Sequence, residues 1–183
     1  MLRGFVARRA VGSDGHVIGV DFSKNMLEKA RTNAHDLGYN NVEFRRGEIE
    51  DLPVPDGSVD VVISNCVLNL VPDKIQAFHE IKRVLRPGGY FSVSDVVLEN
   101  ELPEPLRDNV KMQAGCIASA LLRDDYLSII RETGFEDIDV VEDRPLDVTD
   151  DIFEDFEIDV RQTTEINPNE INASSITVRG RRP

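Results

Sequence analysis

Short apolar runs rich in β-branched residues recur through the first half of the chain. The runs at 16–20, 42–46, 58–64 and 90–96 have the pattern of short strands, and the first of them is expected to be buried. The run Val59–Ile63 has the pattern of a strand that is covered on both faces, as in a parallel sheet. The recurrence of these short strand-like runs constrains the fold more than any other feature of the sequence.

Amphipathic stretches separate these runs. Apolar residues recur at helical spacing from Ser23 to Gly38 and from Pro72 to Leu85, and residues 3–11 resemble the last turns of another helix. We expect Ser23 to cap the first of these helices and Pro72 to start the second. Because parallel strands are joined by crossover helices, the alternation predicts an α/β fold with a mostly parallel sheet.

The second half of the chain has a different pattern. Residues 104–122 are expected to form a helix, Asp124 to cap another that Gly134 ends, and the runs at 137–141 and 174–179 to form an antiparallel pair. The whole of 1–183 is expected to be one domain, since its length suits a single core.

The stretch 147–173 is crowded with carboxylates in its first part and polar in its second. Its acidic residues lack the glycine and the spacing of a calcium-binding loop. We therefore expect an exposed, loosely ordered excursion rather than a metal site.

The composition narrows the possible partners and compartments. A net charge of −13 makes nucleic acid or an anionic membrane surface an unfavourable partner. No run approaches the roughly 18 apolar residues needed to span a bilayer. The two cysteines, Cys66 and Cys116, are expected to be free thiols in a reducing, cytoplasmic compartment. The arginine-rich opening is interpreted as part of a helix, and a transit peptide is the less favoured alternative.

Asp21 and the loop 47–53 each follow a predicted strand. A carboxylate at the end of a strand can accept hydrogen bonds from both hydroxyls of a ribose, and a capping or solvated aspartate is the alternative. An adenine could rest on Ile49 while a neighbouring carboxylate accepts a hydrogen bond from its amino group. A plain surface loop explains the same residues equally well.

Asn65 and Cys66 follow the run Val59–Ile63 directly. Ligands of open α/β sheets bind beyond the carboxyl ends of the strands, which places both residues at a candidate site. The thiol is either a small packing residue or a reactive sulfur. Asp95, near the end of the strand at 90–96, is expected on the same side of the sheet.

Four features in this order resemble a class I S-adenosylmethionine-dependent methyltransferase. They are the ligand-facing Asp21, the loop 47–53, the segment 58–65 and the segment 85–89. The segments 63–74 and 114–121 resemble, more particularly, the arsenite methyltransferases.

The resemblance implies a Rossmann-like sheet that binds S-adenosylmethionine and trivalent arsenic held by cysteine thiolates. Arsenic(III), as arsenite or a thiol conjugate, is soft and thiophilic, so thiolates suit it better than carboxylates. The roles implied are ribose binding by Asp21 and Phe22, adenine binding by Ile49 with Glu48 or Glu50, contact with the methionine part by Asn65, and arsenic binding by Cys66 and Cys116.

The chain departs from the family pattern at its beginning. The family opens with a strand and a Gly-rich loop, and this sequence contains no Gly-x-Gly-x-x-Gly. A further arsenic-binding cysteine near the N-terminus of the family is also absent. We expect a sheet that lacks its first strand, between the strands at 16–20 and 58–64, with weak binding of S-adenosylmethionine. Self-association through the resulting gap is a further expectation.

Two other functions remain open. The first is a methyltransferase acting on a quinone or another small organic acceptor, with both thiols merely packed. The second is a non-catalytic remnant that binds arsenite or a partner subunit through an exposed sheet edge.

Overall fold

The computed structural model describes residues 2–102, 119–146 and 171–183. Contacts between these residues group the chain into two compact units, Met1–Pro55 and Asp56–Pro183, and each is described by itself. The single domain expected over 1–183 stays a prediction.

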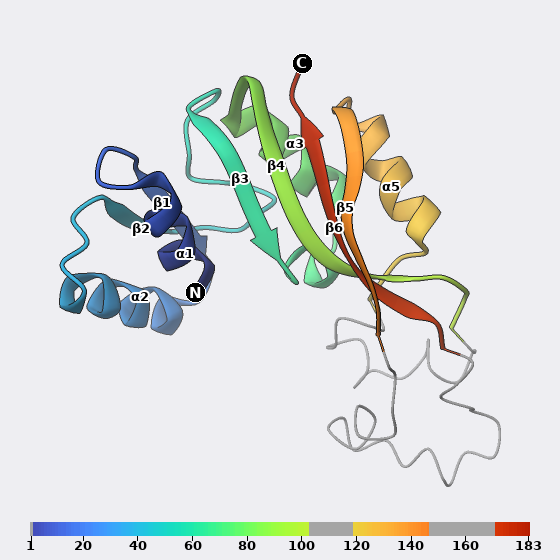
Figure 1. The fold of residues 1–183 in the computed structure, drawn as a ribbon, viewed down its shortest axis with the longest axis horizontal. Helices are drawn as coiled ribbons and strands as arrows, with labels where there is room; N and C mark the ends of the chain where they lie inside the picture. The colour runs from blue at the N-terminus through green and yellow to red at the C-terminus, as the bar shows by residue number, and fades with distance from the viewer. Residues whose placement is uncertain (1, 103–118, 147–170) are drawn as a thin grey trace, which may run out of the picture. The chain divides into compact units, whose positions relative to one another are not determined.

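The first unit consists of two helices and a pair of parallel strands (Figure 1). In chain order these are α1 (Leu2–Val11), β1 (Val17–Asp21), α2 (Lys24–Asp36) and β2 (Val42–Arg46). The strands pair in register from Val17 opposite Val42 to Asp21 opposite Arg46. Ser23 caps α2 as expected, because its side chain accepts a hydrogen bond from the Met26 backbone N–H. The buried face of α2 carries Leu27, Ala30 and Ala34.

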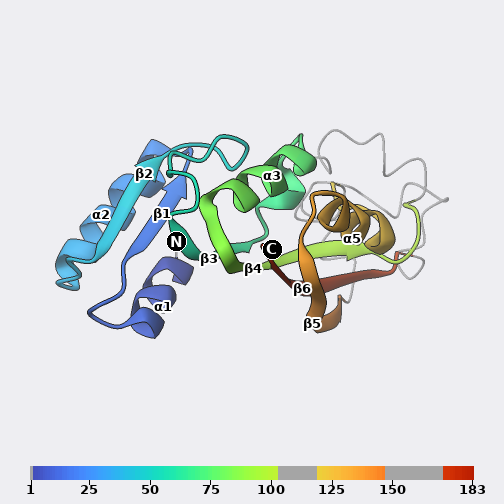
Figure 2. The same cartoon turned by 90° about the horizontal axis from the view of Figure 1, so that it is seen from above.

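The second unit is a four-stranded mixed sheet with helices on one face (Figures 1 and 2). Its elements are β3 (Val59–Asn65), a 3₁₀ turn (Leu68–Leu70), α3 (Lys74–Val84), β4 (Leu85–Leu98), α5 (Arg123–Glu132), β5 (Glu136–Leu146) and β6 (Ala173–Arg181). The strand order is β3-β4-β6-β5, with β3 parallel to β4 and the other two pairs antiparallel. The predicted antiparallel pair at the end of the chain is thus confirmed.

An aromatic cluster fills the space between α3, α5 and the sheet, and Figure 2 shows both helices on the same side of the strands. Phe91 from β4 meets Phe135 with ring centroids 4.7 Å apart, and Phe78 from α3 meets Tyr126 from α5 at 6.0 Å. All four rings are buried, so this cluster is the core of the second unit. Burial of this kind supplies most of the stability of a small sheet packed on two helices.

The strands are less buried than the sequence predicts. Val61 and Ile63 of β3 are 38% and 44% exposed, and none of the five residues of β1 is fully buried. The expectation that Val59–Ile63 is covered on both faces is therefore wrong for the described structure. The reason is that β3 is an edge strand, bonded only to β4, and no described helix of its unit covers the face opposite α3.

Two predicted helix starts also differ from the structure. Asp73 rather than Pro72 caps α3, with its carboxylate accepting the Gln76 N–H at 2.9 Å. Leu122 rather than Asp124 precedes α5, and Asp124 lies in its first turn, where a carboxylate still favours the helix dipole.

Two other predictions fall mainly outside the described residues. Of the helix expected over 104–122, residues 104–118 are not described, and Leu122 forms a bridge to Leu98. Of the excursion at 147–173, only the last three residues are described, and Ala173 begins β6. None of the helices in the described ranges is long and apolar enough to cross a membrane.

Candidate functional site

Asp21 ends β1 with its carboxylate held in a fixed orientation. One carboxylate oxygen accepts the Ser23 backbone N–H at 2.8 Å, and the Asp21 carbonyl accepts the Gly47 N–H at 3.2 Å. Phe22, the next residue, is 72% exposed. The structure therefore provides a partly buried carboxylate beside an exposed ring at the carboxyl end of a strand, which suits a nucleoside.

A tight turn follows β2 in the same unit. The Asp51 N–H donates to the Glu48 carbonyl at 3.2 Å, and the two residues form an isolated bridge. Ile49 and Glu50 form the tip of this turn and are half-buried, whereas Glu48 is exposed. The apolar side chain and a carboxylate are thus adjacent, as the adenine hypothesis requires.

Gly47 lets the chain pass close to Pro53 at the base of this turn. A Cβ atom at position 47 would lie 2.4 Å from Pro53 Cδ and 2.8 Å from Pro53 Cγ. The glycine is therefore needed for a close approach, and it joins the end of β2 to Asp21.

Cys66 follows the last residue of β3, Asn65, in an unusual backbone conformation. Its φ is +52°, a left-handed value that is costly for a residue with a side chain, and its N–H donates to the Ser94 carbonyl at 2.8 Å. The residue is half-buried. Strained backbone of this kind is concentrated at functional sites, where the surrounding structure holds it in place.

The 3₁₀ turn after Cys66 is anchored to β4 and to the start of α3. Leu68 and Asn69 are buried, and the Asn69 side chain donates to the Val96 carbonyl at 2.9 Å. Lys74 Nζ donates to the carbonyls of Asn69 at 3.2 Å and Val71 at 3.1 Å. The segment that carries the thiol is therefore joined to β4 and to the start of α3.

Asp95 lies on β4, between the two residues whose carbonyls bind Cys66 and Asn69, and is 1% exposed. The Tyr126 hydroxyl donates to its Oδ2 at 2.8 Å. Burial raises the pKa of Asp95 to about 6, although the Tyr126 hydroxyl, the Asn69 backbone N–H and the Lys74 charge all favour the ionised form. Among the described residues, the other carboxylate oxygen has no hydrogen-bond partner.

Sequence reasoning missed the contacts of Asn69, Lys74 and Tyr126. Tyr126 is buried on α5, and its hydroxyl pairs with a residue 31 positions away. A buried tyrosine needs a hydrogen-bond partner, so the signal was a Tyr on a buried face with a carboxylate at the end of a core strand. The spacing of residues along the sequence does not show which tyrosine pairs with which carboxylate.

The structure brings the predicted residues together in two groups. Asp21 and Phe22 lie with Glu48, Ile49 and Glu50 in the first unit, and Asn65 and Cys66 lie near Asp95 in the second. Cys116 lies outside the described residues, so its meeting with Cys66 stays a prediction.

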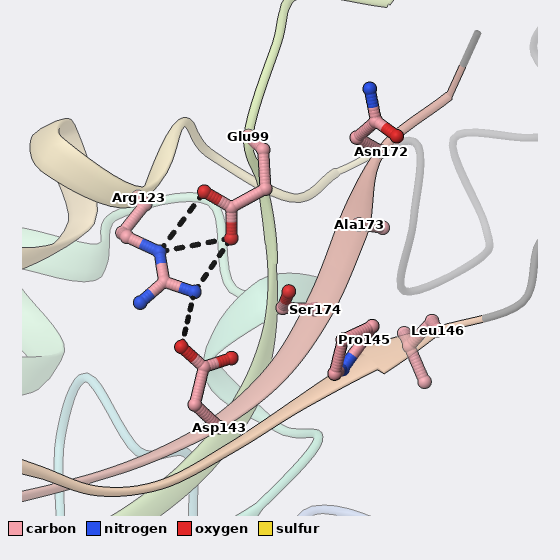
Figure 3. A pocket seen from close by; sticks show the side chains of 8 residues that line it. All are labelled: Glu99, Arg123, Asp143, Pro145, Leu146, Asn172, Ala173 and Ser174. Atoms are coloured by element: carbon pink, nitrogen blue, oxygen red, sulfur yellow. Dashed lines mark hydrogen bonds and ion pairs between the residues drawn. The ribbon is translucent and has the colours of Figure 1, made fainter.

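An open hollow of about 650 Å³ lies elsewhere in the second unit and contains none of the predicted site residues (Figure 3). At its side, Arg123 Nη2 contacts Glu99 Oε1 at 2.6 Å and Asp143 Oδ2 at 2.7 Å. These carboxylates raise the pKa of Arg123 and occupy its guanidinium. No cluster of His, Cys, Asp and Glu that could hold a metal ion occurs in the described ranges.

The comparisons with known proteins identify the family. Residues 3–134 match the family described as methyltransferase domain. The chain belongs to this family. Its fold is the Rossmann-like fold of class I S-adenosylmethionine-dependent methyltransferases, as the sequence predicted, and it is similar to solved structures of such enzymes.

Several similar proteins are arsenic methyltransferases. The chain is 44% identical over 155 residues to the arsenite methyltransferase of Halobacterium salinarum, covering 85% of this chain and 39% of that protein. It is 37% identical to a solved arsenic(III) S-adenosylmethionine methyltransferase from Chlamydomonas reinhardtii, with a TM-score of 0.79, covering 96% of this chain and 58% of that one.

A second group of similar proteins acts on another substrate. The chain is 41% identical over 90 residues to the demethylmenaquinone methyltransferase of Listeria welshimeri, covering 49% of this chain and 38% of that protein. This chain thus spans about two fifths of the length of these curated relatives.

Proposed function

We propose that this chain takes part in methyl transfer from S-adenosylmethionine to trivalent arsenic, with the Cys66 thiolate as an arsenic ligand. The observation that carries the proposal is the half-buried Cys66, held at a positive φ beyond the carboxyl end of β3. The similarity to arsenite methyltransferases over most of the chain supports the choice of acceptor.

The residues of the first unit fit the nucleoside part of S-adenosylmethionine. Asp21 presents a carboxylate oriented by the Ser23 N–H, Phe22 presents an exposed ring, and Ile49 lies beside Glu48 and Glu50. Carboxylate oxygens accept hydrogen bonds from ribose hydroxyls and from an adenine amino group. We assign Asn65 to the methionine part, because it ends β3 next to the thiol.

The chemistry asks little of the protein beyond alignment. The cofactor supplies an electrophilic methyl group on a sulfonium leaving group. Arsenic(III) carries its own lone pair, so no general base is needed, and thiolate ligands hold this soft element where it can be oriented. Cys66, with Cys116 as the second thiolate, would bind and orient the acceptor.

Arsenite binding by cysteine variants tests the proposal. The full chain is incubated with arsenite, dialysed and analysed for bound arsenic. Cys66→Ser is expected to lose most of the binding, Cys116→Ser to weaken it, and Ser64→Ala, a neighbouring change on β3, to leave it unchanged. Undiminished binding by the double cysteine variant would refute the proposal.

A quinone or another small organic acceptor is the second candidate. The similarity to demethylmenaquinone methyltransferases supports it. In that case both thiols are packing residues, and turnover of a quinone acceptor would be nearly unaffected by the two serine substitutions. Arsenite binding without methylated product, in a folded chain, would instead support a binding remnant.

The remaining predictions concern partners and location. A small molecule is the partner we propose, and the net charge of −13 argues against nucleic acid. A cytoplasmic location and self-association through a sheet edge stay predictions.

A further inference from the structure

Only Val67 separates Cys66 from the 3₁₀ turn Leu68–Leu70, so contacts that fix this turn also restrain the backbone that carries the thiol. The turn is attached to β4 at two points: the Cys66 N–H donates to the Ser94 carbonyl at 2.8 Å, and the Asn69 side chain donates to the Val96 carbonyl at 2.9 Å. Asp95 lies between these two attachment points in the sequence of β4.

The Asp95 carboxylate connects the turn to α5. Tyr126 of α5 donates its hydroxyl proton to Asp95 at 2.8 Å, and the Asn69 backbone N–H is close enough to the carboxylate to favour its charged form. Lys74, at the start of α3, adds a nearby positive charge and donates to the carbonyls of Asn69 and Val71. Residues from β4, α3 and α5 thus meet at one turn.

The contacts around the turn Leu68–Leu70 have a role beyond packing, because the backbone at Cys66 is strained. A left-handed backbone at a non-glycine residue costs free energy and persists only where its surroundings hold it. The exposed neighbours Val67 and Leu70 are 42% and 53% exposed and contribute little to that restraint. The restraint comes from the buried residues of the turn, Leu68 and Asn69, and from the hydrogen bond of Asn69 to the Val96 carbonyl.

We propose that Asp95 and Tyr126 are positioning residues for Cys66: through the Asn69 turn they fix the backbone that presents the thiol. The inference deepens the proposed function, since it rests on Cys66 as an arsenic ligand. Neither residue is assigned a contact with the acceptor. Their effect reaches the thiol through the turn.

Local opening of the turn is the property to measure. In the full wild-type chain, hydrogen exchange of the amides at 67–71 should be slow, as in α5. Asp95→Ala and Tyr126→Phe should accelerate it on the order of tenfold, since each removes a buried hydrogen bond. Asp95→Asn keeps an oxygen that accepts the Tyr126 proton and should restore most of the protection.

The thiol gives a second readout. Alkylation of Cys66 by iodoacetamide, followed by peptide mass spectrometry with Cys116 as the internal reference, should accelerate in Asp95→Ala and Tyr126→Phe. Thr177→Val is the matched control, because it removes a hydroxyl that pairs with Ser94 at 2.9 Å on the same strand. It should leave both readouts at the wild-type value even if it lowers the melting temperature.

Three results would overturn the proposal. They are fast exchange at 67–71 in the wild type, unchanged exchange in Tyr126→Phe, and an equal effect of Thr177→Val. If Asp95→Ala fails to fold, the wild-type and Tyr126→Phe measurements still decide. Both readouts are taken without arsenite, so a positive result together with unchanged arsenite binding in Cys66→Ser would retain the positioning role and reject the proposed function.

Discussion

Asp95 is a carboxyl group in the core of the second unit, with a pKa raised to about 6 by burial. A raised pKa means that the unfolded chain ionises first, so folding is favoured below about pH 4 and this contribution is lost as the pH rises to about 6. The difference between 3.8 and about 6 corresponds to about 3 kcal/mol.

Asp95→Asn should therefore flatten part of the pH dependence of the unfolding free energy. As the pH rises from about 4 to about 7, the unfolding free energy of the variant should increase by about 3 kcal/mol relative to that of the wild type. Urea unfolding of both proteins across this range checks the result, with Thr177→Val as control. A constant difference between the two proteins would show that Asp95 does not titrate in this window.

Gly47 and Gly4 offer a second comparison at single residues. Gly47→Ala should lower the unfolding free energy by about 1–3 kcal/mol, because the new Cβ would lie 2.4 Å from Pro53 Cδ. Gly4→Ala, inside α1 with no atom within 4 Å of the new Cβ, should raise it by about 0.5–1 kcal/mol. The urea concentrations at the unfolding midpoints measure the changes in stability of both variants. Equal effects of the two substitutions would contradict the steric argument.

At the scale of single elements, the helix caps in the structure differ from those predicted from the sequence. Asp73→Ala should lower the unfolding free energy by about 1 kcal/mol, because it removes the oxygen that accepts the Gln76 N–H at 2.9 Å. Asp124→Ala, at the residue that the sequence suggested as a cap, should cost only about 0.3–1 kcal/mol through the helix dipole. Thermal melts compare the two. A larger loss for Asp124→Ala would restore the capping role predicted from sequence.

The elements themselves were predictable because their signals are local. The spacing of apolar residues located β1, α2, β2, β3, α3 and β6 to within a few residues. Burial of β3 was not predictable, since exposure of Val61 and Ile63 depends on what lies beside and above the strand. The positive φ of Cys66 was missed for a related reason, because it is imposed by the anchored turn and not by the residue type.

At the scale of the whole molecule, long-range pairings explain what sequence reasoning could not reach. The carboxyl ends of strands identified Asp21, Asn65 and Cys66 as candidates, because that rule needs only strand direction. Contacts across the chain, such as Tyr126 with Asp95, or Arg182 with the carbonyl of Lys82 at 2.9 Å, follow from packing. Such contacts have no periodic signal in the sequence.

The surplus of negative charge gives a prediction for the whole chain. With a net charge of −13, repulsion between carboxylates opposes folding, and added salt should screen it. Salt also weakens surface ion pairs, but pairs such as Arg181 with Glu136 at 2.9 Å are exposed and contribute only about 0–1 kcal/mol each. The screening of repulsion between carboxylates should therefore affect stability more than the weakening of the surface ion pairs does.

The melting temperature should rise as sodium chloride is raised from about 0.05 M to about 1 M, where the screening length falls to about 3 Å. Arg181→Gln is the control, because it removes a cation that contacts both Glu136 and Asp137 at 2.9 and 2.7 Å. Its melting temperature should be lower than the wild-type value in low salt and should approach it in high salt. A melting temperature that falls with salt in the wild type would show that the ion pairs outweigh the repulsion.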